Sequence, residues 1–387
     1  MTIYLDNNAT TPLDERALEA MLPYLRENFG NPSSAHAHGW TAEAAVELAR
    51  EELAEGIGAS PEEVVFTSGA TEADNTALYG MLHPGDHLVT TATEHEAILE
   101  SVKDLERLGI RVTVLPVDSF GLVSPKDLRE AVTPETTLVS IMLANNETGA
   151  INPVRELAEV AHEAGVPFHT DAAQALGKVP VSAGQLGVDL MSLSAHKCYG
   201  PKGVGALYVR RRPLSGVRRV RPEPLLRGGG QERGLRSGTL NVPGIVGFGR
   251  AASLAAAALP EECDRIAGLR DKLWKRLVAG VPDAHLNGHP EARLPNTLNV
   301  SFQGIGAGEL LAALPEVAAS AGSACASASP EPSPVLRAMG VSERVALSSV
   351  RFSLGRFTTS GEVETAAEHI VRAAREVQAA VPDQGER

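Results

Sequence analysis

Two adjacent residues, Lys197 and Cys198, can each act as a nucleophile, and they lie in the segment SLSAHKCYGPKG (192–203). Lys197 follows the apolar run DLMSLSA, which is typical of a buried strand. A lysine held where water is scarce has its charged form disfavoured, so its amine is available to form an imine. Because a buried lysine without a role is costly, we expect Lys197 to do chemistry.

Two earlier segments place polar groups beside predicted strands. In VVFTSGATEADN (64–75) a strand ends near Ser68 and a helix opens near Thr71, which suits a phosphate, although a capped helix has the same pattern. In FHTDAAQALGK (168–178) a strand runs into Asp171, at the end where open α/β sheets bind ligands; a helix-capping Asp is the alternative. A phosphate cradle, a strand-end acid and a strand-end lysine, in that order, are what pyridoxal phosphate requires for its phosphate, ring nitrogen and aldehyde.

Three more residues are candidates for chemistry or packing. Cys325 lies in AASAGSACASASPEPSP, where Ala, Ser and Gly predict a flexible loop with an accessible thiol, and a plain linker is the alternative. Cys263 lies on a predicted helix, and we expect it to pack. Arg351, in SSVRFSLGRFTT, could grip a carboxylate bidentately, as could Arg356; surface arginines are the alternative reading.

The composition argues against several classes of partner. A net charge of -13 argues against nucleic acid. The arginine-rich segment 210–227 is typical of a solvated surface loop, or else of a docking patch for an acidic protein. Three cysteines without metal-ligand spacing predict neither a disulfide framework nor a metal site. The start, MTIYLDNNATTP, lacks a signal-peptide pattern, and no uncharged apolar run of about 18 residues occurs, so we expect a soluble cytoplasmic protein with no membrane contact.

The remaining pattern predicts an α/β fold that positions these residues. Helical periodicity alternates with near-continuously apolar strands, which indicates a mostly parallel sheet covered on both faces by helices. The expected strands are EVVFTS, HLVTTA, RVTVLPV, TLVSIML, PFHTDA, DLMSLSA and GALYVR. A long helix near 243–279 then leads to new strands and a final helix near 360–380. We therefore expect a large α/β domain at 15–250 and a smaller α+β domain formed by 1–14 and 251–387.

Taken together, the motifs resemble those of the NifS/IscS-type cysteine desulfurases, in class V of the pyridoxal-phosphate aminotransferase fold. They span nearly the whole chain in the family's order: YLDNNATTP, GNPSSAH, FTSGATEADNTA, TEHEA, NNETG, HTDAAQALGK, SAHKCYGPKG, GGGQERGLRSGT, SAGSACASAS and RFSLGRFTT. The resemblance implies fold type I of the pyridoxal-phosphate-dependent transferases and a homodimer. It also implies conversion of L-cysteine to L-alanine, with a persulfide passed to a sulfur acceptor such as an iron–sulfur scaffold or a thiolation pathway.

The resemblance implies a role for each matching position. Lys197 matches the Schiff-base lysine, Asp171 the partner of the pyridine nitrogen, and His95 the residue that stacks on the ring and acts in proton transfer. Cys325 matches the nucleophile that forms the persulfide. The other matches are the substrate-carboxylate clamp Arg351 with Asn7 and Asn146 beside it, the phosphate contacts Ala70, Thr71, Ser194 and His196, the contacts to the ring 3-hydroxyl side Asn146 and Gln174, and Thr239, a phosphate contact supplied by the other subunit.

By the same resemblance Cys198 is a bystander, since the family usually has an apolar or aromatic residue there; a redox role is the alternative. Two rival functions stay open on the residues alone. One is an aminotransferase or selenocysteine lyase of the same fold, for which Cys325 is optional. The other is a catalytically silent sulfur-relay or assembly subunit, against which the presence of Lys197, Asp171 and Cys325 speaks.

Overall fold

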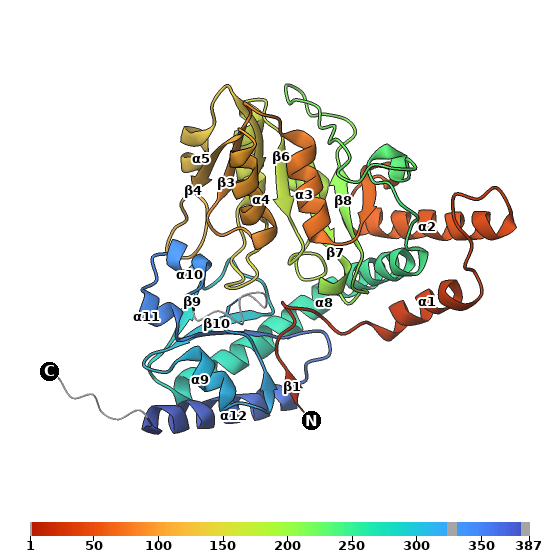
Figure 1. Cartoon of the computed structure of the whole chain (residues 1–387). Coiled ribbons are helices and arrows are strands. Elements are labelled where there is room, and N and C mark those ends of the chain that lie inside the picture. The colour runs from red at the N-terminus through yellow and green to blue at the C-terminus, as the bar shows by residue number, and fades with distance from the viewer. Residues whose placement is uncertain (1, 323–330, 381–387) are drawn as a thin grey trace.

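The computed structural model describes residues 2–322 and 331–380. Within these ranges the chain forms a seven-stranded sheet and a smaller three-stranded sheet (Figure 1). The order of the large sheet is β2-β8-β7-β6-β5-β3-β4. Its strands are β2 (Val64–Thr67), β3 (His87–Thr91), β4 (Arg111–Leu115), β5 (Thr136–Ser140), β6 (Phe168–Asp171), β7 (Leu190–Ser194) and β8 (Gly205–Val209). All of the strands expected from the apolar runs are confirmed.

The direction of the strands explains why distant motifs meet. Strand β8 is antiparallel to both of its neighbours, β2 and β7, while the other neighbouring pairs are parallel. The mostly parallel mixed sheet is therefore confirmed. Because β2 and β7 both run against β8, they point the same way, and the carboxyl ends of β2, β3, β5, β6 and β7 share one edge of the sheet.

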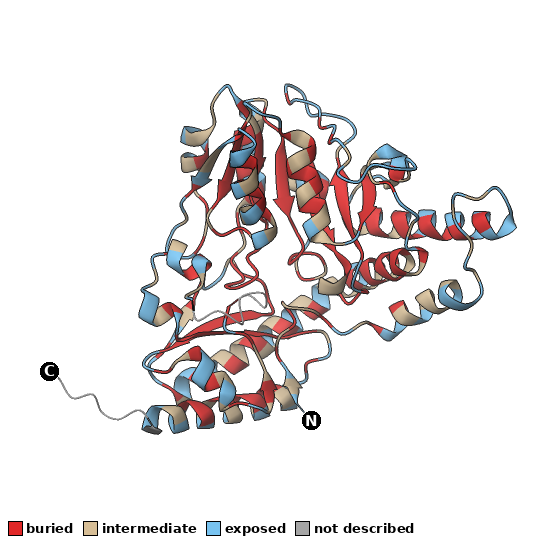
Figure 2. Ribbon diagram, viewed as in Figure 1, coloured by how far each residue is buried: buried red, intermediate tan, exposed pale blue. Residues whose placement is uncertain are grey.

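Helices cover both faces of the large sheet, as its near-continuously apolar strands require. On β5, Leu138 and Val139 point to opposite sides and belong to separate apolar cores. Helices α3 (Ala70–Met81) and α4 (Glu96–Arg107) cover the first side. The other side is covered by α2 (Ala37–Gly56), α6 (Val154–Glu163) and the first half of α8 (Val242–Gly280). Figure 2 shows the strands buried between these layers.

A second, smaller unit lies below the large sheet in Figure 1. Its central strand β10 (Thr297–Phe302) pairs antiparallel with β9 (Ala284–Asn287) and with β12 (Ser349–Ser353). Beside this sheet, β1 (Ile3–Tyr4) pairs parallel with β11 (Val317–Ala318). The helices of this region are α9 (Ala307–Ala312), α10 (Pro334–Ala338), α11 (Glu343–Ala346) and α12 (Ser360–Ala380).

Helix α8 connects the two units. Phe248, in its first half, packs in the core of the large sheet, whereas Leu273, in its second half, packs in the core of the small one together with Leu5. The predicted boundary at residue 250 thus falls inside a continuous helix, and the division into 15–250 and the remainder stays a prediction. Among the described residues α8 alone has the length and composition of a membrane span, but 56% of that apolar window is buried, as in the core helix of a globular protein.

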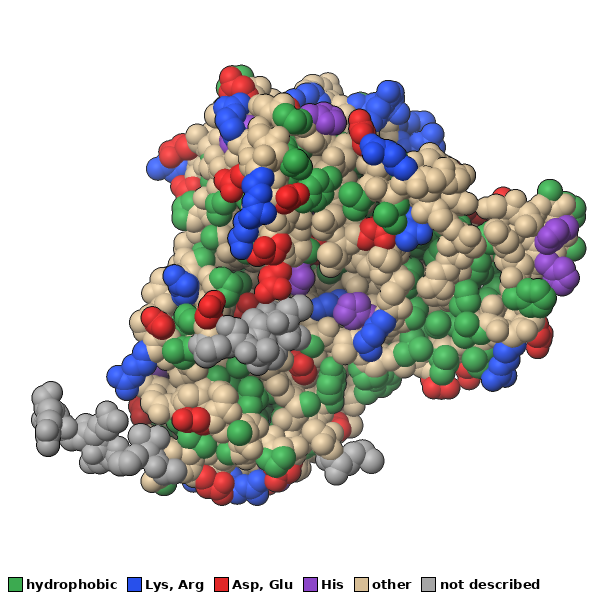
Figure 3. All heavy atoms as spheres, viewed as in Figure 1, with side chains coloured by type: hydrophobic (Ala, Val, Ile, Leu, Met, Phe, Trp, Pro, Cys, Tyr) green, Lys and Arg blue, Asp and Glu red, His purple; other side chains and the backbone are tan. Residues whose placement is uncertain are grey.

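The remaining helices are α1 (Glu15–Arg26), α5 (Pro125–Ala131) and α7 (Ala183–Leu186). Helices α1 and α2 pack on α8 and extend to one side of the molecule (Figure 1). The arginine-rich segment runs over the surface, where Arg211, Arg212 and Arg219 are exposed. Figure 3 shows positive side chains gathered at the upper edge, away from the smaller unit. The expectation of a surface loop is confirmed.

Candidate active site

A cavity of about 410 Å³ opens at the carboxyl edge of the large sheet, against the small unit. This volume lies within the range of small-molecule sites. Its wall comes from the segments that follow β2, β3, β6 and β7, and from Arg351 on β12. Residues that are far apart in the sequence are thus gathered because parallel strands end at a common edge.

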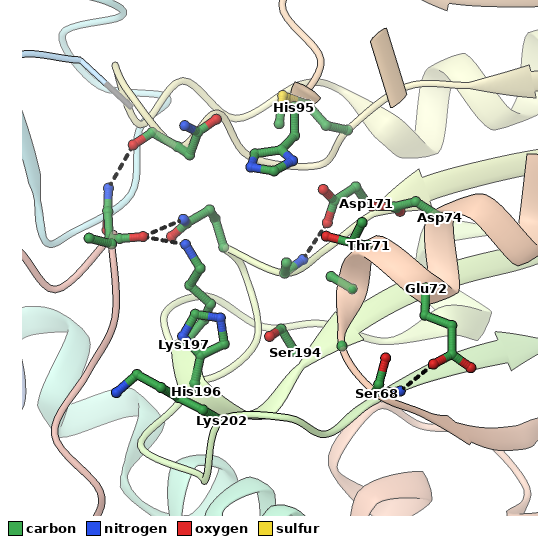
Figure 4. Close-up of a pocket in the computed structure, with 18 of the residues that line it drawn as sticks. Ser68, Thr71, Glu72, Asp74, His95, Asp171, Ser194, His196, Lys197 and Lys202 are labelled. Atoms are coloured by element: carbon green, nitrogen blue, oxygen red, sulfur yellow. Dashed lines mark hydrogen bonds between the residues drawn. The ribbon is translucent and has the colours of Figure 1, made fainter. Parts of the chain in front are cut away.

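Lys197 enters the cavity from the turn that follows β7 (Figure 4). Its Nζ donates a hydrogen bond to the backbone carbonyl of Asn8 at 2.5 Å. The neighbouring Cys198 points elsewhere: it is 1% exposed, packs in the large apolar core, and donates its thiol to the Ala195 carbonyl at 3.3 Å. Burial raises the pKa of Cys198 to about 12. Of the two nucleophiles, the lysine faces the cavity and the cysteine does not.

The start of α3 forms one end of the cavity. Gly69 caps the helix in an extended conformation, and the first helical bond runs from the Ala73 amide to the Gly69 carbonyl at 3.1 Å. The amides of Ala70 and Thr71 precede this bond, so they are available for an anion, and the helix dipole favours one there. Glu72, in the same turn, is held by Arg236 at 2.9 Å, which offsets its negative charge beside the cradle.

Acidic side chains gather at the other end. Asp171, on β6, is 6% exposed, and its Oδ1 accepts the Ala173 amide at 2.8 Å. Burial raises the pKa of Asp171. Asp74, on α3, lies beside it in Figure 4, and burial, followed by the negative charge of Asp171, raises the pKa of Asp74 well above its ordinary value. Because both carboxyl groups are buried and lie next to each other, a proton shared between them is favoured until a cation binds nearby.

Two histidines complete the walls. His95 precedes α4, and its Nδ1 accepts the Ala97 amide at 3.1 Å, so the proton of the neutral ring lies on Nε2. The ring faces the cavity across from Ser194 and Lys197 (Figure 4). His196 hydrogen-bonds Thr10 through Nδ1 at 3.1 Å. Burial and then the charge of Lys197 lower the pKa of His196 to about 4, so its ring is neutral near pH 7.

The small unit contributes a buried cation. Arg351 is 1% exposed; its Nη2 lies 2.8 Å from Oδ1 of Asp6, and its Nη1 donates to the Asn146 carbonyl at 2.9 Å. Its Nε has no hydrogen-bond partner among the described residues. A buried N–H without a partner is costly and is therefore suited to an incoming anion.

Most of the predicted site residues meet at this cavity. Those that line it are Ala70, Thr71, His95, Asn146, Asp171, Gln174, Ser194, His196, Lys197 and Arg351. Asn7 does not line it, because its side chain donates to the Ser353 carbonyl at 2.9 Å. Thr239 is exposed and outside the cavity of its own chain. Cys325 lies outside the described residues.

Sequence reasoning missed several lining residues, among them Asn8, Asp74, Met142 and Lys202. Three of these lie within segments already singled out: Asn8 in YLDNNATTP, Asp74 in VVFTSGATEADN and Lys202 in SLSAHKCYGPKG. A signal was therefore present, but the pattern does not tell which of two neighbouring side chains faces the cavity. Met142, two residues beyond β5, carries no polar signal at all.

The residues present fit pyridoxal phosphate. The amide cradle at Ala70 and Thr71 suits its phosphate, the buried acid Asp171 suits a protonated ring nitrogen, and Lys197 suits its aldehyde. A buried carboxyl group whose pKa is raised gains most from a cationic partner, and the ring nitrogen supplies one.

Comparison with known proteins agrees with this geometry. The family model "Aminotransferase class-V" matches residues 3–365. The chain is 55% identical over 375 residues to "Cysteine desulfurase IscS" of Anaeromyxobacter sp. (strain Fw109-5), covering 96% of this chain and 91% of that protein. A solved "NIFS-LIKE PROTEIN" superposes with a TM-score of 0.89 at 41% identity, covering 97% of this chain and all of the other.

A further solved structure, "SspA in complex with cysteine", matches with a TM-score of 0.80 at 37% identity, covering 92% of this chain and 100% of that one. The matches extend over both units of the structure, so they include every segment that lines the cavity. The chain therefore belongs to the class-V aminotransferase family, among its NifS/IscS-type cysteine desulfurases.

Proposed function

We propose that the cavity is the active site of a pyridoxal-phosphate-dependent cysteine desulfurase, which converts L-cysteine to L-alanine and keeps the sulfur as an enzyme-bound persulfide. The observation that carries the proposal is the meeting of Lys197, Asp171 and Arg351 in one cavity. The relatives named cysteine desulfurase and the neighbour solved with cysteine support the substrate.

The chain's own residues divide the work. When bound, pyridoxal phosphate supplies an electron-poor ring that accepts the electron pair left when a bond to the substrate Cα is broken. Lys197 is placed to hold the aldehyde carbon, and Asp171 to keep the ring nitrogen protonated. When not bonded to the coenzyme, Nζ of Lys197 would serve as the base that takes the Cα proton of a substrate in this cavity. His95 has its proton on Nε2 and lies across the cavity from Lys197, so it could move a proton on the side of the cavity opposite Lys197.

Arg351 orients the substrate. Asp6 holds Nη2 and the Asn146 carbonyl holds Nη1 of this cavity-lining residue, so the guanidinium plane is fixed before the substrate arrives, while Nε has no partner among the described residues. A fixed plane gives a carboxylate one geometry, which would hold the substrate in one orientation within the cavity that Lys197 also lines.

The sulfur step is assigned to Cys325 on the strength of the resemblance. Its thiolate attacks the substrate sulfur; the S–S bond forms as the Cβ–S bond breaks, and Cβ keeps the electron pair and takes a proton. The sulfur is oxidised and Cβ is reduced within one substrate, so L-alanine and a persulfide result without an external oxidant.

The test is product analysis on the purified holoenzyme. With excess dithiothreitol and L-cysteine, we expect alanine and sulfide in equal amounts. Cys325→Ala should lose sulfide release while keeping the visible absorbance of the bound coenzyme, and Cys263→Ala, on α8, is the matched control. Alanine and sulfide at the unmodified rate from Cys325→Ala would favour the rival lyase, and protein that never takes up coenzyme would favour the silent subunit.

We further propose that the enzyme is a homodimer. Large apolar side chains are exposed on α1, α2 and the segment between them, including Leu25, Phe29 (76% exposed), Trp40 and Leu48. Such a patch calls for a partner, and Thr239, which lies outside its own chain's cavity, supports a second copy as that partner. Sedimentation of the holoenzyme should give a mass of two chains. In the double variant Phe29→Asp, Trp40→Asp the measured mass should fall to that of one chain.

The setting of the reaction follows the same proposal. A cytoplasmic location suits an enzyme whose reactive thiol must stay reduced, and the acceptor of the sulfur is a protein thiol or an iron–sulfur scaffold. The bacterial relatives named cysteine desulfurase IscS support an iron–sulfur acceptor. Recovery of the acceptor by cross-linking to sulfur-loaded enzyme would identify it.

A further inference from the structure

A second lysine lies directly behind the cavity. Lys178 is 7% exposed, and it does not line the cavity itself. Its Nζ donates to Oε1 of Gln174 at 2.6 Å and to Oδ1 of Asn8 at 3.2 Å. Both of these acceptors belong to residues that do line the cavity. Nothing in the reaction described above uses this amine.

The environment of Lys178 is unusual for a lysine. Its two acceptors are neutral amide oxygens, and it takes part in no ion pair among the described residues. Burial, and then the positive charges of Lys197 and Arg351, lower the pKa of Lys178 well below its ordinary value. The two amide oxygens of Gln174 and Asn8 each accept an N–H of this amine.

These bonds fix the orientation of the Gln174 amide. The oxygen and nitrogen ends of an amide are nearly the same size, so the hydrogen-bond partners decide which way it faces. With Oε1 held by Lys178, Nε2 donates to the carbonyl of Asn8, a residue that lines the cavity, at 2.9 Å. That carbonyl also accepts from Lys197.

The Asn8 amide is fixed in the same way. Its Oδ1 accepts from Lys178 and also from Nδ2 of Asn296, the latter at 2.9 Å. Its Nδ2 therefore donates, to Thr297 at 2.8 Å and to the Asn146 carbonyl at 3.2 Å. The lysine thus connects two amides of the cavity wall, one from each unit of the structure.

We propose that Lys178 is a positioning residue for the coenzyme, which holds Gln174 so that the second N–H of Nε2 is left for the ring hydroxyl. The proposal rests on the coenzyme site proposed above and deepens it. The hydroxyl oxygen of the coenzyme ring needs a hydrogen-bond donor. A flipped Gln174 would instead present its acceptor, Oε1, to that oxygen. The flipped form would give up the bond from Lys178 to Oε1 and would set that oxygen against the Asn8 carbonyl, so Lys178 adds to the preference for the observed orientation.

The test is the affinity of the apoprotein for pyridoxal phosphate. Lys178→Met keeps the hydrocarbon stem and removes both donors. We expect coenzyme binding to weaken about 10-fold, the size of one hydrogen bond to a polar or charged group. We also expect the pH midpoint of the coenzyme's visible band to rise, because an oxygen that loses a donor holds its proton more tightly. A purely structural role would leave that midpoint in place.

A double-mutant cycle separates positioning from packing. If Lys178 acts through Gln174, adding Lys178→Met to Gln174→Met should weaken binding by less than about twofold. Cys263→Ala is the matched control, because its thiol contacts the Lys178 carbonyl at 2.9 Å but neither amide, and it should leave coenzyme affinity unchanged.

Each outcome decides the matter. An unchanged affinity in Lys178→Met, or full additivity in the cycle, overturns the positioning role. Wild-type protein that fails to bind pyridoxal phosphate overturns the proposed function instead. Should urea unfolding show that Lys178→Met is not folded, Lys178→Gln replaces it. The glutamine side chain keeps a polar donor in the core but is too short to reach Oε1 of Gln174. If Lys178→Gln binds pyridoxal phosphate as tightly as the wild type does, the proposal is overturned.

Discussion

Nη2 of Arg351 lies 2.8 Å from Oδ1 of Asp6, so the cation that faces the cavity is already paired before any substrate arrives. Asp6 offsets the cost of burying the guanidinium, whose side chain is 1% exposed. Asp6 contacts only Nη2 of the guanidinium, and Nε, which has no partner among the described residues, is left for the substrate carboxylate.

Replacing Arg351 with Lys should therefore damage substrate binding more than coenzyme binding. An ammonium group cannot keep the contacts of Nη1 and Nη2 and also offer an N–H at the position of Nε, so we expect kcat/KM for L-cysteine to fall about 100-fold. The measurement is alanine formation against L-cysteine concentration, with coenzyme absorbance recorded in parallel. Arg155→Lys, on the exposed face of α6, is the control. An unaltered KM would show that the carboxylate binds elsewhere.

Cys198, although adjacent to Lys197, should be dispensable. Its pKa of about 12 keeps the thiol protonated near pH 7, and its burial keeps reagents away. We expect Cys198→Ala to retain alanine production within about twofold and to lose about 1 kcal/mol of stability from the lost contacts. Alkylation of the native protein by iodoacetamide, read by mass spectrometry, should leave Cys198 unmodified. Rapid labelling there would contradict its buried state.

Asp74→Asn should change how stability depends on pH. Burial and the charge of Asp171 raise the pKa of Asp74 above its ordinary 3.8 in the folded state, while Glu94 adds to the repulsion and Ser192 opposes it. Nearby His169 stays neutral, because burial lowers its pKa to about 3. The folded protein therefore holds this proton more tightly than the unfolded chain does.

The favourable contribution is complete below pH 3.8 and is lost as the pH rises toward the folded-state value. Asparagine does not titrate, so the apoprotein with Asp74→Asn should gain stability relative to the wild type between about pH 4 and pH 7, by up to about 1.4 kcal/mol per pH unit. Urea unfolding at both pH values measures the difference. A difference that does not change with pH would mean that Asp74 is ionised in the folded state.

Glu232→Ala should be the most destabilising of these changes. Both oxygens of Glu232 accept from Arg50, at 2.7 and 2.8 Å, and one also accepts the Phe66 amide at 2.7 Å. Both side chains are almost fully buried. Removing one partner leaves a buried cation, which costs about 3 to 5 kcal/mol. Glu100→Ala, in an exposed pair with Lys103, should cost less than about 1 kcal/mol, and denaturant unfolding compares the two.

The sequence by itself determined the α/β architecture and the gathering of Lys197 and Asp171. Near-continuously apolar strands separated by helices predict a parallel sheet, and residues that follow such strands must meet at its carboxyl edge. The order of the motifs then predicted the family, which comparison confirmed.

The tertiary structure alone decided the finer choices. It turned Asn8 rather than Asn7 into the cavity and Cys198 rather than Lys197 into the core. It also paired Arg351 with Asp6 and placed Lys178 behind Gln174. Periodicity describes which face of an element is buried, but not which segment from a distant part of the chain packs against it. The bonds from Arg351 to the Asn146 carbonyl and from Lys178 to Asn8 join the two units, and their geometry is set by that packing rather than by any local pattern.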